Sequence, residues 1–442
     1  MVKYEANIKK GDVELKVFTK VLSDYFQKLK INIPKELSIK NVQMDSKKVE
    51  KGSLFIAINN GNNYIDEALE RGAELIICDK DLDVINPKII KVSNSIKFLQ
   101  DIAKIYRENL NIKIIAVTGS EGKTTTKDLI FGVLSHKYTA KKTLGNYNNQ
   151  IGLPFSILQL NEKDEVAVLE MGMSNLGEID LLSQISKPDY AIITNIGDSH
   201  LEFLINRDNV FKAKTEVLKY LNKDYVLVYG DDPYLKNLGT LKVGFDLENN
   251  FKISDELEVY EGVHFRLNDE KYFVPLNGLY NAINASFAIS IGKLLGMSYQ
   301  EIKESLEKIK ITSMRFEKIE KDGILFINDA YNASPVSMEM ALKAFSSLPL
   351  NRKKVVVLGD ALELGEKEIE YHKIILLEAL RHSFDGIFIY GERMKKASEI
   401  LSNSKVTYFA EKSTIRDELN KMGNIAVLLK GSRGMKLEEI IM

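Results

Sequence analysis

The most constraining feature of the sequence is a glycine-rich segment, TGSEGKTT at 118–125, that stands between an apolar run and a helical pattern. The apolar run at 112–118 is typical of a buried parallel strand. Glycines let the backbone curl until its N–H groups point into one concavity, and the following helix adds its positive end. We therefore predict a phosphate-binding loop in which Lys123 faces the outer phosphates and the Thr124 hydroxyl binds Mg²⁺.

This loop is shorter than the general P-loop pattern. The pattern requires a glycine five residues before Gly122, but Val117 occupies that position and the glycine stands at 119. The nucleotide-binding residues predicted here are Gly119, Ser120, Glu121, Gly122, Lys123, Thr124 and Thr125.

Strand and helix patterns alternate through most of the chain, which predicts a doubly wound α/β fold. After the loop, strands are expected at 165–170, 190–195 and 225–229, with helices at 124–134, 177–185 and 209–221. A second series has strands at 324–328, 354–358, 386–390 and 425–429. The polar section at 240–275 predicts smaller strands at the edge of the middle domain. We expect domains at 1–108, 109–313 and 314–442.

Composition excludes several classes of protein. Lys plus Arg total 61 and Asp plus Glu total 62, so the charge gives no reason to expect a nucleic acid or an anionic membrane as partner. Cys78 is the single cysteine, which rules out an internal disulfide, and its apolar surroundings predict a buried strand residue. No signal peptide or membrane span is recognisable, and a cytoplasmic protein is expected.

Metal ligands are expected at the carboxyl ends of strands beside the loop, where open α/β sheets bind their ligands. Glu170 ends one predicted strand, and His200 follows another after a short turn. The pattern leaves a solvated carboxylate and a structural histidine as alternatives. Lys214 looks, on its own pattern, like an exposed helix lysine.

Several segments in one order resemble the Mur ligase family. They are TGSEGKTTTK at 118–127, GNYNNQIGLP at 145–154, EMG at 170–172, TNIG at 194–197 with SHL at 199–201, DAYNASP at 329–335, LGD at 358–360 through ELG at 363–365, and KGSRGM at 430–435. The resemblance covers nearly the whole chain and is weaker before residue 110. GNYNNQIGLP and DAYNASP are most similar to the branch that adds D-alanyl-D-alanine.

The resemblance implies a small N-terminal domain for the uridine nucleotide, a central ATPase domain and a Rossmann-like C-terminal domain for the dipeptide. It implies ligation of D-alanyl-D-alanine to UDP-N-acetylmuramoyl-tripeptide through an acyl phosphate, with ATP, two Mg²⁺ ions, a carbamylated Lys214 and a monomeric enzyme. The implied catalytic residues are Lys123, Glu170, His200, Lys214 and Asn149. Metal ligands would be Thr124, Glu170, His200 and Lys214. Further nucleotide contacts would be Asn281, Asn284, Arg315 and Asp329. Substrate contacts would be Ser46, Asn148, Asn149, Tyr331, Asn332, Lys430 and Arg433.

The chain departs from the family pattern in places. Tyr280 stands where His is usual, Lys47 stands where Arg is usual, and an Asp-Gly-His element expected after Ile58 is missing. These changes affect the expected substrate contacts and leave the nucleotide loop intact. Two alternatives remain open: a related ligase that adds an amino acid or extends a polyglutamate chain, and a nucleotide-binding regulatory or scaffold protein without ligase activity.

Overall fold

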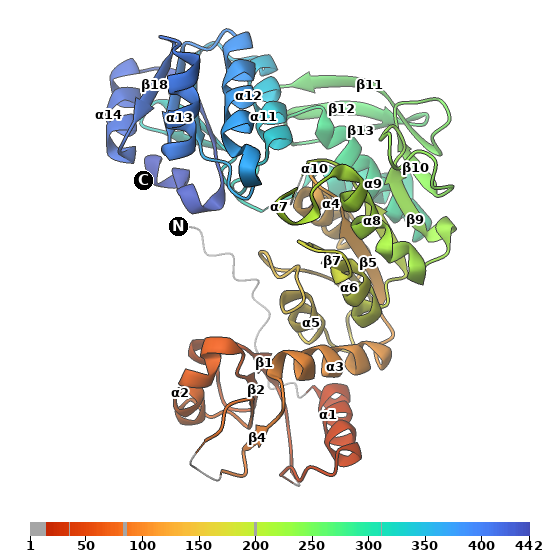
Figure 1. Cartoon of the computed structure of the whole chain (residues 1–442). Coiled ribbons are helices and arrows are strands. Elements are labelled where there is room, and N and C mark those ends of the chain that lie inside the picture. The colour runs from red at the N-terminus through yellow and green to blue at the C-terminus, as the bar shows by residue number, and fades with distance from the viewer. Residues whose placement is uncertain (1–14, 35, 83–85, 199–200, 311) are drawn as a thin grey trace.

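The computed structural model describes residues 15–34, 36–82, 86–198, 201–310 and 312–442 (Figure 1). Within these residues the strands form three sheets, each accompanied by its own helices, and this confirms the predicted three-domain α/β fold. The N-terminal sheet lies at one end of the molecule and the C-terminal sheet at the other, with the central sheet between them. No helix of the described residues is long and apolar enough to cross a lipid bilayer.

The N-terminal sheet is parallel, and its strands follow one another in chain order. Its strands are β1 (Asn41–Gln43), β2 (Ser53–Ile56), β3 (Leu75–Cys78) and β4 (Ile89–Lys91). Its helices are α1 (Lys16–Lys28), α2 (Ile65–Glu70) and α3 (Ser95–Glu108). The apolar run at 75–78 forms a fully buried strand, so the prediction that Cys78 is a buried strand residue is confirmed.

The central sheet has the order β13-β12-β11-β10-β9-β8-β5-β7-β6. Its strands are β5 (Lys113–Thr118), β6 (Ala140–Lys142), β7 (Val166–Glu170), β8 (Tyr190–Ile193), β9 (Val226–Tyr229), β10 (Leu241–Gly244), β11 (Phe251–Val259), β12 (Gly262–Leu267) and β13 (Glu270–Val274). The strands from β6 to β11 pair in parallel, whereas β12 and β13 add antiparallel strands. The section at 240–275 thus forms edge strands, as predicted.

Helices cover both faces of this central sheet. They are α4 (Lys123–Leu134), α5 (Gly152–Ile157), α6 (Glu178–Ser186), α7 (Leu201–Leu204), α8 (Arg207–Lys214), α9 (Tyr280–Leu294) and α10 (Tyr299–Glu307). One apolar core unites α4, α9 and α10 with one face. The core of the other face includes α5, α6 and α8, and it continues without a break into α1, α3 and the N-terminal sheet. Helix α3 therefore packs against two domains at once.

The C-terminal sheet has the order β14-β15-β19-β16-β17-β18 and is parallel except for the β14–β15 pair. Its strands are β14 (Glu317–Lys321), β15 (Ile324–Asn328), β16 (Lys353–Gly359), β17 (Gly386–Tyr390), β18 (Val406–Phe409) and β19 (Ile425–Lys430). Its helices are α11 (Pro335–Ser347), α12 (Glu368–Arg381), α13 (Glu392–Leu401) and α14 (Lys412–Met422). Apolar cores fill both faces of this sheet.

The linker between the central and C-terminal domains runs from the end of α10 to the start of β14. Two of its residues that are not glycine, Met314 (φ 61°) and Phe316 (φ 54°), have left-handed backbone conformations on either side of Arg315. The expected domain boundaries fall in this linker and between α3 and β5, and their residue numbers stay predictions.

Candidate active site at the nucleotide loop

The predicted phosphate loop joins β5 to α4 and packs tightly against the end of β8. Gly119 has φ +141°, and a Cβ atom there would lie 1.9 Å from Thr194 Oγ1 and 2.9 Å from the Thr194 backbone nitrogen. The Glu121 N–H donates to Asn195 Oδ1 over 2.9 Å, and the Gly197 N–H donates to Ser120 Oγ over 2.8 Å. Parallel pairing of β5 with β7 and β8 sets this geometry, because it brings the carboxyl ends of the strands together.

Two lysine ammonium groups meet at one carbonyl of the loop. Lys123 Nζ donates to the Gly119 and Ser120 carbonyls over 2.9 and 2.8 Å, and Lys214 Nζ donates to the Gly119 carbonyl over 2.8 Å. Lys214 is 1% exposed, so the pattern-based interpretation of an exposed helix lysine is wrong. Burial, and then the neighbouring Lys123, lower the pKa of Lys214 well below its usual value. Burial also lowers the pKa of Lys123, so the loop carries two buried amines whose charged forms are disfavoured in the empty site.

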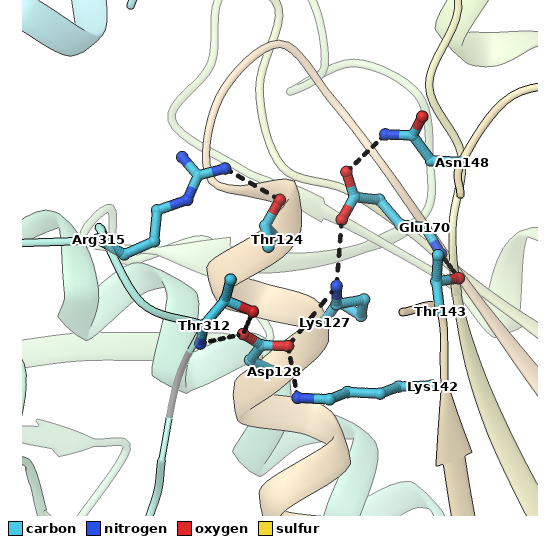
Figure 2. Close-up of polar contacts among 9 residues, drawn as sticks. All are labelled: Thr124, Lys127, Asp128, Lys142, Thr143, Asn148, Glu170, Thr312 and Arg315. Atoms are coloured by element: carbon cyan, nitrogen blue, oxygen red, sulfur yellow. Dashed lines mark hydrogen bonds and ion pairs between the residues drawn. The ribbon is translucent and has the colours of Figure 1, made fainter. Parts of the chain in front are cut away.

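Glu170 ends β7 as predicted and is almost fully buried. Its Oε1 accepts from Asn148 Nδ2 over 2.8 Å (Figure 2), and its buried Oε2 has no hydrogen-bond partner among the described residues. Oε2 instead forms an ion pair with the Lys127 ammonium, 3.5 Å away (Figure 2). A buried carboxylate oxygen without a donor fits the hard oxygen ligand that Mg²⁺ prefers.

Thr124, the other residue expected at that metal, has a buried hydroxyl that accepts from Arg315 Nη2 over 3.1 Å (Figure 2). The described residues contain no group of three or more acidic, histidine or cysteine side chains that would hold a metal alone. His200 lies outside the described residues. Of the residues predicted to hold metal ions, the described part of the chain contains Glu170, Thr124 and Lys214.

A cavity of about 400 Å³ opens beside the loop, between the central and C-terminal domains. Sequence-predicted residues that line it are Glu121, Gly122, Thr125, Asn281, Asn284, Arg315, Asp329 and Lys430. The two asparagines form a chain, in which Asn284 Nδ2 donates to Asn281 Oδ1 over 2.9 Å and Asn281 Nδ2 donates to the Asn277 carbonyl over 2.7 Å. Lining residues that sequence reasoning missed are Arg207, Tyr229, Val336 and Met340, whereas Ile196 and Tyr280 lie in segments that were compared with the family. The apolar and aromatic surfaces of Ile196, Tyr229, Tyr280, Val336 and Met340 suit a planar base.

The C-terminal domain reaches the loop through several side chains. Ser334 Oγ donates to Glu121 Oε1 over 2.5 Å, and the Arg315 guanidinium lies 4.3 Å from the centre of the Tyr331 ring. Lys430 pairs with Asp329 over 2.7 Å and donates to the Asn332 carbonyl over 2.8 Å. These contacts bring most of the predicted C-terminal residues to one place beside the nucleotide loop. Arg433 instead pairs with Glu438.

Two predicted substrate residues have structural partners. Ser46, in the N-terminal domain, donates from Oγ to Glu67 Oε2 over 2.7 Å. Asn149 is exposed, and its Oδ1 accepts from the backbone N–H groups of Ile151 and Gly152 over 3.1 and 2.9 Å at the start of α5. The described contacts give Asn149 a turn-capping role, and its catalytic role stays a prediction.

Sequence reasoning also missed two buried charges on α4, Lys127 and Asp128, which are each 1% exposed. Asp128 accepts from Lys142 Nζ over 2.8 Å and from the N–H and hydroxyl of Thr312, each over 2.7 Å. A signal was present, because the two adjacent charges stand one turn after Thr124 and directly before the apolar run at 129–131 of the same helix.

Comparisons with known proteins identify the family of the chain. Residues 117–292 match the Mur ligase middle domain, and residues 314–433 match the Mur ligase, glutamate ligase domain. The UDP-N-acetylmuramoyl-tripeptide–D-alanyl-D-alanine ligase of Bacillus subtilis (strain 168) is 39% identical over 424 residues, which cover 91% of this chain and 92% of that protein. The enzyme of the same name from Borreliella burgdorferi is 33% identical, with 91% and 95% coverage.

Solved structures give the same result. MurF from Acinetobacter baumannii superposes with a TM-score of 0.86 at 27% identity, covering 96% of this chain and 97% of that one. The MurF ligase from Thermotoga maritima, solved in complex with ADP, gives a TM-score of 0.80 at 29% identity, covering 91% and 96%. The chain belongs to the Mur ligase family.

Proposed function

We propose that the chain ligates D-alanyl-D-alanine to UDP-N-acetylmuramoyl-tripeptide, forming the pentapeptide precursor of peptidoglycan together with ADP and phosphate. The observation that carries this proposal is the site itself: a phosphate loop with two lysines at one carbonyl, beside Glu170 and under Arg315. The names of relatives that match over nine-tenths of both chains support the substrates.

The reaction has two steps. A carboxylate oxygen of the tripeptide attacks the γ-phosphorus of ATP, the bond to the β-phosphate oxygen breaks, and ADP leaves. The free amine of D-alanyl-D-alanine then attacks the acyl carbon, loses a proton, and the tetrahedral intermediate expels phosphate to leave the amide. Positioning and charge neutralisation provide most of the catalysis in such transfers. Lys123 provides positive charge at the loop, and closure of the C-terminal domain over the cavity excludes water that would hydrolyse the acyl phosphate.

Mg²⁺ would neutralise charge on the phosphate oxygens during the transfer. Thr124 and Glu170 would hold one ion, and His200 with carbamylated Lys214 would hold the other. Glu170 Oε2 supports the first assignment, because among the described residues it is buried with an ion pair to Lys127 and no hydrogen bond. Asn148 positions the same carboxylate through its amide.

Carbamylation of Lys214 is supported by its burial. The depressed pKa favours the neutral amine, whose lone pair attacks CO₂ while a proton leaves, and the product is an anionic carbamate. In the described part of the chain the Lys214 ammonium donates to the Gly119 carbonyl and forms no ion pair, and the Glu121 carboxylate offsets the effect of burial only in part. A ¹³C carbonyl resonance that appears with labelled bicarbonate, and is absent from Lys214→Met, is the expected observation.

The remaining roles follow the domain arrangement. The N-terminal domain, with Ser46, would hold the uridine nucleotide, whereas Asn332, Tyr331, Lys430 and Arg433 would contact the dipeptide. The altered segment after Ile58 lies in the N-terminal domain, so any shift in substrate preference is expected in the UDP-linked partner. A monomer in the cytoplasm remains our expectation.

The test is phosphate release from ATP and Mg²⁺ with each substrate alone and both together. Release that requires both, with the pentapeptide product seen by mass spectrometry, supports the proposal. Release with a single amino acid in place of the dipeptide indicates the related ligase activity instead. Nucleotide binding without release for any tripeptide variant refutes ligation and favours the regulatory or scaffold alternative.

A further inference from the structure

The buried charges on α4 fasten the interdomain linker to the nucleotide helix. Both donors of Thr312, the backbone N–H and the hydroxyl, reach Asp128 Oδ2 over 2.7 Å (Figure 2). Asp128 lies one helical turn after Thr124, and 184 residues separate it from Thr312 in the chain. Two short bonds to one buried carboxylate fix the start of the linker beside the phosphate loop.

Arg315 follows three residues later, in the strained linker segment 314–316, which we call the arch. Met314 and Phe316, on either side of it, have left-handed backbones, which residues with a side chain keep only where other contacts hold them. The Phe316 N–H donates to Asp329 Oδ1 over 3.1 Å. The arch is thus bracketed by two carboxylates, Asp128 in the central domain and Asp329 in the C-terminal domain.

Compensating charges keep Asp128 ionised in its buried position. Lys142 Nζ and Lys127 Nζ lie 2.8 and 3.6 Å from Oδ1, and Lys127 also lies 3.5 Å from Glu170 Oε2. Burial opposes ionisation, but these lysines and the Thr312 hydroxyl hold the pKa of Asp128 below its usual value. Hydrogen bonds to an ionised acceptor are about twice as strong as neutral ones, so the two bonds from Thr312 to Asp128 hold the linker tightly.

We propose that Asp128 is a positioning residue for Arg315, holding the linker at Thr312 so that the guanidinium reaches the nucleotide. Arg315 lines the cavity and contacts Thr124, whereas Asp128 and Thr312 do not line the cavity. Asp128 therefore acts through the linker. The inference rests on the proposed function in one respect only, namely that the nucleotide is ATP.

The test is a double-mutant cycle on nucleotide binding, read by calorimetry with Mg²⁺ and the non-hydrolysable analogue adenylyl imidodiphosphate. The proteins are wild type, Thr312→Val, Arg315→Met and the double variant. Removal of a charged donor is expected to weaken binding about 10- to 100-fold for Arg315→Met. A misplaced donor is expected to weaken it about 3- to 10-fold for Thr312→Val, with less than about a twofold further loss in the Arg315→Met background.

Two controls separate positioning from loss of structure. Thr240→Val makes the same chemical change at a buried hydroxyl that has no hydrogen-bond partner in the described part of the chain, and this variant is expected to bind like wild type. Thr312→Ser keeps the hydroxyl and is expected to restore binding. Equal losses from Thr312→Val in both backgrounds, or no loss beyond that of Thr240→Val, overturn the inference. Nucleotide binding needs no second substrate. A wild-type protein that fails to ligate would therefore overturn the proposed function, and the binding cycle would still test the inference about Asp128.

Discussion

Gly119 should tolerate no side chain, and the structure sets the size of the penalty for Gly119→Ala. An alanine there adopts a left-handed backbone, which costs roughly 1–2 kcal/mol. Its Cβ would also lie 1.9 Å from Thr194 Oγ1 and 2.9 Å from the Thr194 nitrogen, and overpacking of this kind costs about 1–3 kcal/mol. Because the second contact is backbone, rotation of the Thr194 side chain relieves only part of it. We expect the free energy of unfolding to fall by roughly 2–5 kcal/mol.

Gly177→Ala is the matched control. Gly177 also has a positive φ, +86°, and precedes a helix, but a Cβ atom there meets nothing within 4 Å. Gly177→Ala should lower the free energy of unfolding only by the cost of its left-handed backbone, about 1–2 kcal/mol. Urea unfolding of both variants measures the difference. Gly119→Ala should also bind nucleotide more weakly, because displacement of the Gly119 carbonyl moves the shared acceptor of Lys123 and Lys214. Equal losses of stability in the two variants would refute the steric reasoning.

Three further predictions concern other parts of the chain. The buried Tyr106 hydroxyl donates to the Leu160 carbonyl over 2.8 Å. Tyr106→Phe should therefore lower the free energy of unfolding by about 1 kcal/mol in urea denaturation. An unchanged free energy of unfolding would contradict this prediction. His372 Nε2 accepts from the Ala361 N–H, and burial lowers the His372 pKa. Its contribution to stability is therefore present above pH about 6.5 and declines as pH falls towards the lower folded pKa, so wild type should lose stability more steeply than His372→Gln between pH 7 and 5 in unfolding titrations. Glu170→Gln should raise the Mg²⁺ concentration for half-maximal turnover by about 10-fold or more, and an unchanged Mg²⁺ dependence would exclude Glu170 as a ligand.

Much of the fold could be predicted because its strands are short apolar runs with clear ends. The runs at 113–118, 166–170 and 425–430 have nearly every residue buried, and buried parallel strands show this pattern in sequence. The loop at 119–122 could be found as well, because its glycines and lysine lie next to one another. Parallel pairing then explains why Glu170 lies near the loop.

Other features depend on segments far apart in the chain. The burial of Lys214 could not be read from its helix, because the loop at Gly119 covers it, 95 residues away. Asp128 and Thr312 are farther apart, at 184 residues, and the backbone of Met314 and Phe316 follows from contacts on both sides of the linker. A pattern along the chain carries no information on such contacts.

The packing of helix α3 against two domains determines how the molecule unfolds. Its apolar residues belong to a core that continues from the N-terminal sheet into one face of the central sheet, whereas the C-terminal cores are separate. Heating should therefore give two calorimetric transitions, not three, with the first two domains melting as one cooperative unit. A fragment cut after residue 108 would expose the surface that α3 covers, so the central domain is expected to aggregate when expressed alone.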